Sequence, residues 1–560
     1  MSRILFFLLA SFSFSSLLAQ SVNAPLNDDY YHLIDRYEIL QGEIHPGFFT
    51  NWKPYMRNQI AAFADSLSQR SDLDAIDRFN MGYFRSDNWE WSDNPDNSSR
   101  KPFLKHFYRV KPDLFHVDTR DFNLHVNPVL HLSAGSASDT DDIPFINTRG
   151  AEVRGWIDRK LGFYGYIGEN QIIYPGYVRD QIDQTLAVPG EGFWKGYQDN
   201  GVDFLTARGY ISFNPTEHLN IQFGHDRFRV GNGYRSMILS DFAPAYTFFK
   251  FEAQVWKLKY TMLVSELTAD VEGNRSGLTG TDEFPNKWLA FHHLTFNIGR
   301  KLNVGVFESV IYGPNEIGES RNFELKYLNP IIFYRAIEQQ DGSSDNVVLG
   351  LDFKWLPVRS VSLYGQFMLD ELVIDDLKEG NGWWGNKFGI QAGAEYVNAF
   401  GIRHLDLQVE TNISRPYNFS HDSPYGSYSH YRQPLAHPRG ANFKEFIGIA
   451  RFQPAPKWMV TGKLIYSDYG LDTLSSNWGG NILLNNSTRE QNYNNKIGQG
   501  VSTQQLFADL RVSFMWKHNF FIEAHHTFRN VESEFEPYSL RSNVTELAIR
   551  WNIPARLSEF

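Results

Sequence analysis

The residues best suited to chemistry lie in one segment, which runs from Phe223 to Pro244 and combines charge with glycine. We expect this segment to leave the end of a strand and form an outer loop. Its titratable side chains are His225, Asp226, Arg227, Arg229 and Arg235. A planar arginine side chain can pair with the carboxylate of a uronic acid. Alternatively, such charges fix a loop in place, because a buried charge needs a partner. We favour this structural role for a loop cluster made of Asp226, Arg227, Arg229, Gly231 and Gly233, whose glycines permit tight backbone turns.

A second set of candidates consists of large aromatic residues in stretches rich in Gly, Asn and Asp. A flat aromatic ring can pack against the apolar face of a sugar ring, and neighbouring Asn, Asp or Arg side chains can hydrogen-bond the sugar hydroxyls. The alternative is that these rings anchor the protein at a membrane interface or pack within loops. The candidate polysaccharide-binding residues are Trp194, Tyr197, Tyr234, Arg235, Trp383, Trp384, Tyr425 and Trp478.

Signatures of catalysis and of metal binding are weak. The chain has no cysteine, which excludes thiolate metal ligands, a Cys nucleophile and disulfides. It contains neither the Gly-x-Ser-x-Gly elbow of lipases nor a phosphate-binding P-loop. In His292-His293 and His525-His526, neighbouring side chains would point to opposite faces of a strand, so neither pair favours a shared metal ion. We therefore expect no catalytic residue, no metal, no cofactor and no enzymatic activity.

The elements that position these residues follow a period of two. From about Asp121 to Ile553, segments of apolar and polar residues in alternation recur in pairs, which is typical of a transmembrane β-barrel. We predict about eighteen antiparallel strands, at 121–135, 147–158, 161–174, 203–213, 218–229, 246–254, 256–268, 287–298, 301–313, 345–356, 359–371, 387–399, 402–414, 444–454, 457–469, 503–516, 518–531 and 541–553.

The alternation also predicts which side chains face lipid. In the segment 402–414, Leu405, Leu407 and Val409 belong to an apolar face, and Asp406 and Glu410 belong to a polar one. We expect the apolar face to contact hydrocarbon and the polar face to line the lumen. The joins between strands alternate between short and long; if the short ones are periplasmic, both chain termini are periplasmic too. One expected short join is Asn214-Pro215.

Composition agrees with a barrel and excludes several other classes. The mean hydropathy is −0.40, which argues against a helical membrane protein. Aromatic residues make up 16% of the chain, and barrels place such residues in two interfacial belts. The net charge of −11 is spread along the chain without a basic stripe, so we expect no nucleic-acid partner.

The N-terminal part differs from the rest. Residues 1–19 resemble a secretory signal peptide, with Arg3 before an apolar stretch and Ala19 at a plausible cleavage point. Residues 20–118 predict a helical periplasmic region. Helical spacing of apolar residues favours one helix after Pro54 and a second around Leu73 to Phe79. Whether this region caps the barrel 119–560 or plugs it stays open.

The segment 223–244 resembles the capsule-assembly Wzi family. The resemblance lies in its arginine-rich strand end, in Gly231-Asn232-Gly233-Tyr234-Arg235-Ser236, and in the following Leu239-Ser240-Asp241 with a nearby proline. The stretch from Tyr31 to Glu38 is similar to the start of family members from Bacteroidetes-type bacteria. The resemblance implies an eighteen-strand barrel, periplasmic helices that block its inner side, and a lectin-like role in holding capsular polysaccharide. It identifies no individual binding residue.

We therefore expect an outer-membrane barrel of a Gram-negative bacterium that binds capsular or exopolysaccharide and helps to assemble or anchor it at the cell surface. Its other partner is the outer-membrane lipid, and its oligomeric state is left open. Two alternatives also fit the sequence. One is a porin-like channel for an oligosaccharide or a hydrophobic solute, and the other is a structural partner in a larger envelope complex.

Overall fold

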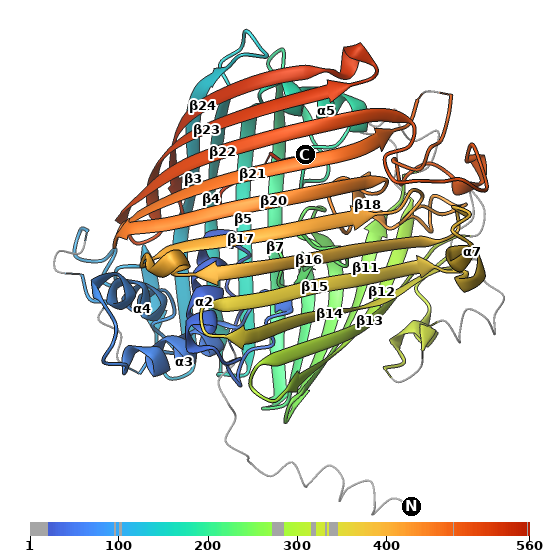
Figure 1. Ribbon diagram of the computed structural model, residues 1–560. Coiled ribbons are helices and arrows are strands. Elements are labelled where there is room, and N and C mark those ends of the chain that lie inside the picture. Colours follow the sequence, from blue (N-terminus) through green and yellow to red (C-terminus); the bar gives the residue numbers. More distant parts are fainter. Residues whose placement is uncertain are drawn as a thin grey trace, which may run out of the picture.

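The computed structural model describes residues 21–93, 97–99, 103–270, 285–314, 321–330, 333–334, 345–473, 475–556 and 558–559. The expected signal peptide at 1–19 lies outside the described residues. Most of the described chain forms one closed antiparallel sheet (Figure 1). The sheet closes because the last strand pairs with the first long one, from Val544 opposite Ala137 to Trp551 opposite Leu130.

The wall of this barrel has eighteen strands, so the predicted fold class is confirmed. They are β3 (Phe122–Ala137), β4 (Phe145–Ile157), β5 (Leu161–Ile173), β7 (Gly201–Thr216), β8 (Leu219–Asp226), β10 (Tyr246–Val255), β11 (Leu258–Thr268), β12 (Asn286–Ile298), β13 (Leu302–Tyr312), β14 (Asn346–Val358), β15 (Val361–Glu371), β16 (Lys387–Val397), β17 (Leu405–Ser414), β20 (Phe443–Ala455), β21 (Trp458–Leu471), β22 (Val501–Lys517), β23 (Phe520–Ser533) and β24 (Leu540–Trp551).

The wall buries its polar residues and exposes its apolar ones, which is the reverse of a soluble protein. In β17 the side chains of Asp406, Gln408 and Glu410 are buried in the lumen, whereas Val409 is 47% exposed on the outside. The middle of β22 repeats the pattern with Leu510, which is 51% exposed. Such an outer surface is stable only against hydrocarbon, because large exposed apolar faces are unfavourable in water.

The short joins gather at one end of the barrel and the long joins at the other, as predicted. One short join differs from the prediction. β7 continues past Asn214-Pro215 to Thr216, and the turn falls at Glu217-His218. The register between β7 and β8 shifts between Phe213 and Thr216. This irregularity accommodates Pro215, which has no backbone N–H to donate to the ladder.

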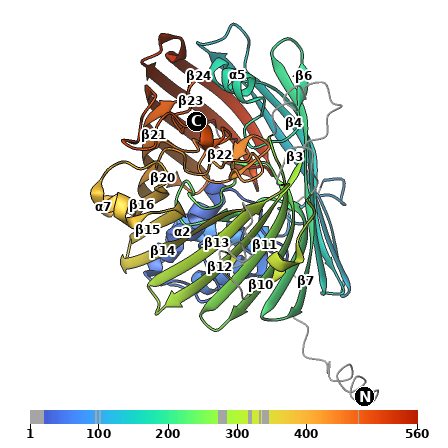
Figure 2. The same cartoon turned by 90° about the vertical axis from the view of Figure 1, so that its right-hand side faces the viewer.

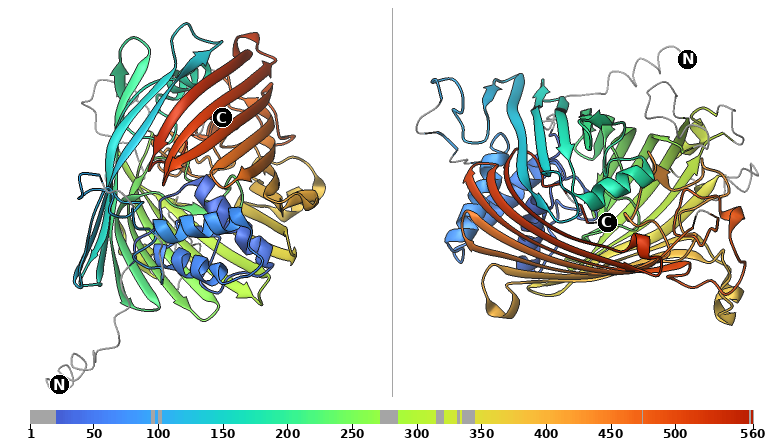
Figure 3. Two further views of the ribbon diagram at one scale, coloured as in Figure 1. Left: turned by 90° about the vertical axis from the view of Figure 1, so that its left-hand side faces the viewer. Right: turned by 90° about the horizontal axis from the view of Figure 1, so that it is seen from above.

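The N-terminal region contains three helices at the short-join end, α2 (Asp28–Gln41), α3 (Arg57–Ser68) and α4 (Ala75–Asp87) (Figure 3). The helices predicted after Pro54 and near Phe79 correspond to α3 and α4. They pack through an apolar core that includes Ile60, Phe63 and Phe84. Helix α2 was not predicted, and it lies inside the ring of strands (Figure 2). Among the described residues, no helix is both long and apolar enough to cross a membrane.

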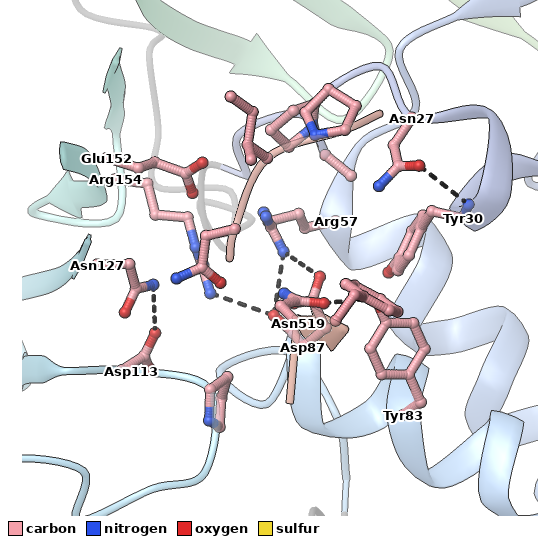
Figure 4. A pocket seen from close by; sticks show the side chains of 17 residues that line it. Asn27, Tyr30, Arg57, Tyr83, Asp87, Asp113, Asn127, Glu152, Arg154 and Asn519 are labelled. Carbon is pink, nitrogen blue, oxygen red and sulfur yellow. Dashed lines mark hydrogen bonds and ion pairs between the residues drawn. The ribbon is translucent and has the colours of Figure 1, made fainter. Parts of the chain in front are cut away.

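Buried charges join the α3–α4 pair to the barrel wall (Figure 4). Arg57 at the start of α3 forms an ion pair of 2.9 Å with Asp87 at the end of α4. The wall residue Arg154 of β4 donates to the Asp87 carbonyl at 3.2 Å. The short strand β2 (Phe115–Asp118) then pairs with β3, so the segment 20–118 ends within the barrel sheet rather than before it. The helical region is therefore attached to the wall both by side-chain contacts and by strand pairing.

The lipid-facing wall generates a first prediction. Leu510→Arg puts a charge near the middle of β22, where it would face hydrocarbon, and should lower the free energy of unfolding by about 2–4 kcal/mol. The control is Leu377→Arg, at an exposed position of α7 (Ile374–Glu379) in a long join, and it should change little. The measurement is denaturant unfolding of the protein in lipid vesicles. Equal small effects of both substitutions would mean that no hydrocarbon surrounds β22.

Candidate functional site

The segment predicted as an outer loop instead folds back into the lumen, which corrects the sequence interpretation. After β8 the chain forms β9 (Arg229–Val230), which pairs with β1 (Trp52–Lys53) of the N-terminal region. The three residues Met237, Ile238 and Leu239 are almost fully buried in the largest apolar cluster. This apolar run explains the inward course, because exposure of these side chains to water would be unfavourable. We call residues 227–245 the inward loop.

Polar side chains of the wall hold the backbone of the inward loop. The Glu410 carboxylate accepts hydrogen bonds from the backbone N–H groups of Tyr234, at 2.6 Å, and Arg235, at 3.0 Å. A Cβ at Gly233 would lie 2.5 Å from Gln391 Oε1 and 2.6 Å from a Glu410 carboxylate oxygen, so a larger residue would displace these two wall side chains. Gly231 has a φ of +113°, which favours glycine for a different reason. The two predicted glycines thus permit close contact with the wall.

Arg229 connects the inward loop to α2. Its guanidinium donates to Asp28 at 2.8 Å and to the Tyr234 carbonyl at 2.6 Å. Burial by itself would lower the pKa of Arg229, but the carboxylates of Asp28, Asp241 and Glu410 together outweigh burial and hold the pKa above its ordinary value. The ion pair between Arg229 and Asp28 is therefore structural, as the sequence analysis favours for the loop cluster. Arg227 differs, because its only side-chain hydrogen bond in the described part of the chain goes to the Gly190 carbonyl, at 3.4 Å.

Ion pairs fix α2 across the lumen. Its charged side chains contact wall strands at separate positions around the barrel, so the helix is held from several sides. The contacts are those of His32 and Arg36 with Asp406 of β17, of Asp35 and Glu38 with Lys354 of β14, and of Asp29 with Arg511 of β22 and Arg550 of β24. Breaking one partner of such a buried pair is costly, because the other charge is then left unpaired.

The long join 415–442 adds a further layer inside the barrel. It contains β18 (Ser429–His430) and β19 (Gln433–Pro434), which pair with each other. His430 Nδ1 accepts a hydrogen bond from the Thr268 N–H at 3.0 Å, and its Nε2 donates to the Ala245 carbonyl at 3.2 Å. His430 therefore joins this layer both to β11 and to the end of the inward loop. Helix α2, the inward loop and this join together occupy the lumen.

The candidate polysaccharide-binding residues divide into two groups. Four are buried or nearly so: Trp194, Tyr234, Arg235 and Tyr425. The hydroxyl of Tyr234 donates to the Glu559 carboxylate at 2.6 Å, and burial together with Glu559 raises its pKa well above the ordinary value. Arg235 lies 3.6 Å from the same carboxylate. The other four, which are Tyr197, Trp383, Trp384 and Trp478, are partly exposed in the long joins.

Tyr417 connects the joins that carry three of these partly exposed residues. The ring of Trp384 lies 6.1 Å from that of Tyr417 and 6.0 Å from that of Trp383. The backbone of Tyr417 donates to the Gly479 carbonyl at 2.9 Å, next to Trp478. Three joins that are distant in sequence therefore meet at one place. We call Trp383, Trp384 and Trp478 the tryptophan platform. Tyr197 lies apart from it, in β6 (Lys195–Tyr197).

Charged groups border the tryptophan platform. The guanidinium of Arg489 lies 4.1 Å from the ring centroid of Trp384, which is close enough for a cation–π contact. Arg415 donates to the Trp383 carbonyl at 3.1 Å. Burial lowers the pKa of Arg415. The platform thus combines flat rings with cationic donors, the combination expected for sugars that carry hydroxyl and carboxylate groups.

An outer pocket of about 250 Å³ lies beside these joins and was not predicted from the sequence. Gln181 and Gln184 of α5 (Gly176–Thr185) line one part of it, and Arg432, Arg439 and Asn481 line another. The guanidinium of Arg439 packs over the Tyr469 ring at 4.1 Å, and its Nε and one Nη have no hydrogen-bond partner in the described part of the chain. The stretch 431–440, rich in arginine and proline, was the available signal.

The histidine pairs lie as expected, on opposite faces of the wall. His293 contacts Asp352 in the lumen at 2.7 Å, and His292 contacts Glu308 on the outside at 3.2 Å. One group in the described residues places ligand atoms within 4.8 Å of one another, namely Asp74, Asp77 and His404. Asp74 is the N-cap of α4 and accepts two backbone N–H groups, so this group is explained as a helix cap.

The buried His430 generates a pH prediction. Burial lowers its pKa to about 3, although the hydrogen bond to the Ala245 carbonyl acts in the opposite direction. The unfolded chain takes up this proton near pH 6.5, so acidification favours unfolding. Between pH 6.5 and pH 5 the free energy of unfolding should fall by about 2 kcal/mol on account of this group.

Denaturant unfolding at both pH values checks this expectation. His430→Gln should reduce the loss of stability on acidification, whereas His218→Gln, in an exposed turn, should leave it unchanged. An undiminished loss in the His430→Gln protein would show that this imidazole does not stay neutral in the folded state.

Comparisons with known proteins support the fold. No protein-family model and no curated protein matches the chain. Among solved structures, Wzi from Escherichia coli aligns with a TM-score of 0.56 and 14% identity, over 95% of this chain and 100% of that chain. Its structure is described as a carbohydrate-binding β-barrel of an outer-membrane protein involved in group 1 capsule assembly.

Two Pseudomonas aeruginosa barrels align less closely. OccK8 (OprE) has a TM-score of 0.42 and 8% identity, over 76% of this chain and 97% of that one. OprD has a TM-score of 0.41 and 10% identity, over 76% and 94%. At such identities a likeness speaks for the fold alone. The chain has the fold of the Wzi barrel, as the sequence resemblance implied.

Proposed function

We propose that this protein is a non-enzymatic barrel that binds surface polysaccharide and helps to assemble or anchor capsule or exopolysaccharide. The observation that carries the proposal is the contrast between its two regions. Helix α2 and the inward loop are fixed across the lumen by buried ion pairs, whereas the long joins bring the tryptophan platform together. The region available to a large ligand is therefore the outer end.

The mechanism is multivalent binding. Flat rings of the tryptophan platform pack against sugar faces, and Arg415 and Arg489 supply donors for hydroxyl and carboxylate groups. Each contact is weak. A polymer repeats its sugar units, so once one unit is bound the next contact is effectively intramolecular. The name of the E. coli structure, which records carbohydrate binding for that protein, supports this class of ligand.

The candidate polysaccharide-binding residues differ in exposure, and therefore in their suitability for direct contact with a polymer. Trp383, Trp384 and Trp478 are the preferred contact residues, and Tyr197 is a further one. Tyr234, Arg235, Trp194 and Tyr425 are less suited to direct contact, because protein groups already surround them. We assign Tyr234 and Arg235 to the support of the inward loop instead. The short-join end with its helices is proposed to face the periplasm.

The first test measures polysaccharide retention. Removing two stacking rings at about 1 kcal/mol each should weaken polymer binding about 30-fold. Cells that carry Trp383→Ala with Trp384→Ala should therefore shed polymer into the medium while still synthesising it. The control is Trp458→Ala, because Trp458 is 44% exposed on a wall strand and away from the long joins. Unchanged retention in cells that lack the protein altogether would remove the anchoring function.

The second test separates this proposal from a channel. An eighteen-strand wall is wide enough to enclose an aqueous pore, so a barrel of this size could act as a channel if its lumen were open. Because three layers occupy the lumen, the full-length protein should give no steady single-channel current in a planar bilayer. A stable open current through the unaltered protein would favour solute transport.

A further inference from the structure

A second cavity lies in the lumen, on the inner side of the inward loop. It has a volume of about 260 Å³ and is lined by strands from opposite parts of the wall. Pro189, Phe242 and Pro438 line both this cavity and the outer pocket, so these three residues form the partition between them. The lumenal cavity and the outer pocket therefore adjoin each other at these three residues.

One side of the cavity carries arginine residues without carboxylate partners. Arg208 of β7 lines the cavity with its guanidinium 4.7 Å from the centroid of the Tyr166 ring. In the described part of the chain it has neither a hydrogen bond nor a carboxylate within ion-pair distance, and its Nε is buried without a partner. Arg227 also lacks an ion pair there, and its Nε is unpartnered too.

These two arginines differ from others in the same lumen. Arg550 forms two hydrogen bonds with the Glu523 carboxylate, at 2.8 and 2.9 Å, and Arg36 pairs with Asp406. A cation held away from water without a partner is unfavourable, which is why paired arginines are the rule in protein interiors. Arg451, on the same cavity, also has no carboxylate within ion-pair distance in the described part of the chain, but it donates to the Gln408 side chain at 2.9 Å. Arg208 and Arg227 have no side-chain partner of this kind among the described residues, which indicates a place that can accept an anion.

Electrostatics agree with this geometry. Burial lowers the pKa of Arg227, and the neighbouring cation Arg208 lowers it further. For Arg227 the carboxylates of Asp241, Glu191 and Asp226 act in the opposite direction but do not restore its ordinary pKa. The Asp226 carboxylate also stabilises the charge of Arg208, from beyond ion-pair distance. Asp226 accepts the backbone N–H of Arg227 at 2.9 Å. Glu191 is engaged by the Thr206 hydroxyl at 3.0 Å and by Arg556 at 3.3 Å.

Other groups in the cavity complete a polar and aromatic lining. His131 of β3 is only 5% exposed, and its Nδ1 has no hydrogen-bond partner among the described residues. Tyr166 and Tyr174 add flat rings to the same lining. A group that fits here carries a carboxylate for the guanidinium forks, a ring for the tyrosines, and a hydroxyl for the imidazole.

We propose that the arginine side of the lumenal cavity binds the carboxylate of an acidic sugar, a uronate unit, that enters from the outer pocket past Phe242. This inference rests on the proposed function and specifies its ligand as a polymer with acidic units. Arg208 and Arg227 hold the carboxylate, and Tyr166 packs against the sugar ring. The outer tryptophan platform would then bind further units of the same chain.

Calorimetry with the full-length protein in detergent tests this site. D-glucuronate is the probe, and D-glucose, acetate and inorganic phosphate are compared with it. Glucuronate should bind at least tenfold more tightly than the other three. Arg208→Gln and Arg227→Gln should each weaken glucuronate binding at least tenfold, whereas Arg300→Gln, in an exposed turn, should not change it.

Several outcomes would overturn the assignment. Glucuronate binding that survives both substitutions places the ligand elsewhere, and equal binding of acetate or phosphate means that the site takes simple anions. Absence of glucuronate binding overturns it directly. The melting temperature of each variant controls for folding, and Arg208→Lys, which keeps the charge but loses the fork, should still weaken binding. Failure here leaves polymer retention by cells intact, so it is distinguishable from failure of the proposed function.

Discussion

The structure depends on the need to pair every backbone amide and carbonyl within hydrocarbon. An unpaired group there costs several kcal/mol, so a sheet that crosses the membrane has to close on itself. Closure is achieved between β24 and β3, whose paired segment extends from Val544–Ala137 to Trp551–Leu130. Once the ring is closed, its outer face has to be apolar because it contacts lipid, and its inner face can carry polar groups.

A ring of this width creates a second problem, because its interior has to be filled or left to water. This chain fills it with its own segments. The contacts are mostly charged, such as Lys354 with Glu38 at 2.6 Å and Arg229 with Asp28 at 2.8 Å. Charged pairs of this kind are directional and leave a costly unpaired group when broken. They therefore fix α2 and the inward loop in one position, and an apolar core forms between the inward loop, the wall and the join 415–442.

These constraints explain what the sequence could predict. Each wall strand contacts lipid on one side and polar groups on the other. Its apolar and polar residues therefore alternate along the strand, as in β17, and this alternation is visible in the sequence alone. Helix α2 has no such signal. It is surrounded by the lumen, and both apolar Ile34 and charged Asp35, Arg36 and Glu38 are buried along it. Without an apolar stripe and a polar face, helical periodicity does not appear in the residue pattern.

The entry of the inward loop into the lumen could not be predicted from the sequence, for a different reason. Its anchors, Gln366 and Glu410, are more than a hundred residues away in sequence, and nothing local to Gly231 or Gly233 reveals them. The glycines indicated a tight approach but not its partner. The same limit applies to the tryptophan platform, since the joins that carry Trp384 and Trp478 contact each other and Tyr417 across long distances in the sequence. Contacts between distant joins require the closed wall before they can be seen.

The two ends of the barrel can therefore be assigned different tasks on physical grounds. A binding surface made from several joins loses affinity if those joins move independently, because ordering them on binding costs entropy. Here the joins are attached to a filled lumen. His430 of one join contacts Ala245 of the inward loop, and Glu410 of the wall holds that loop in turn. The filled interior thus supports the outer surface, by fixing in advance the rings that we propose contact a repeating polymer.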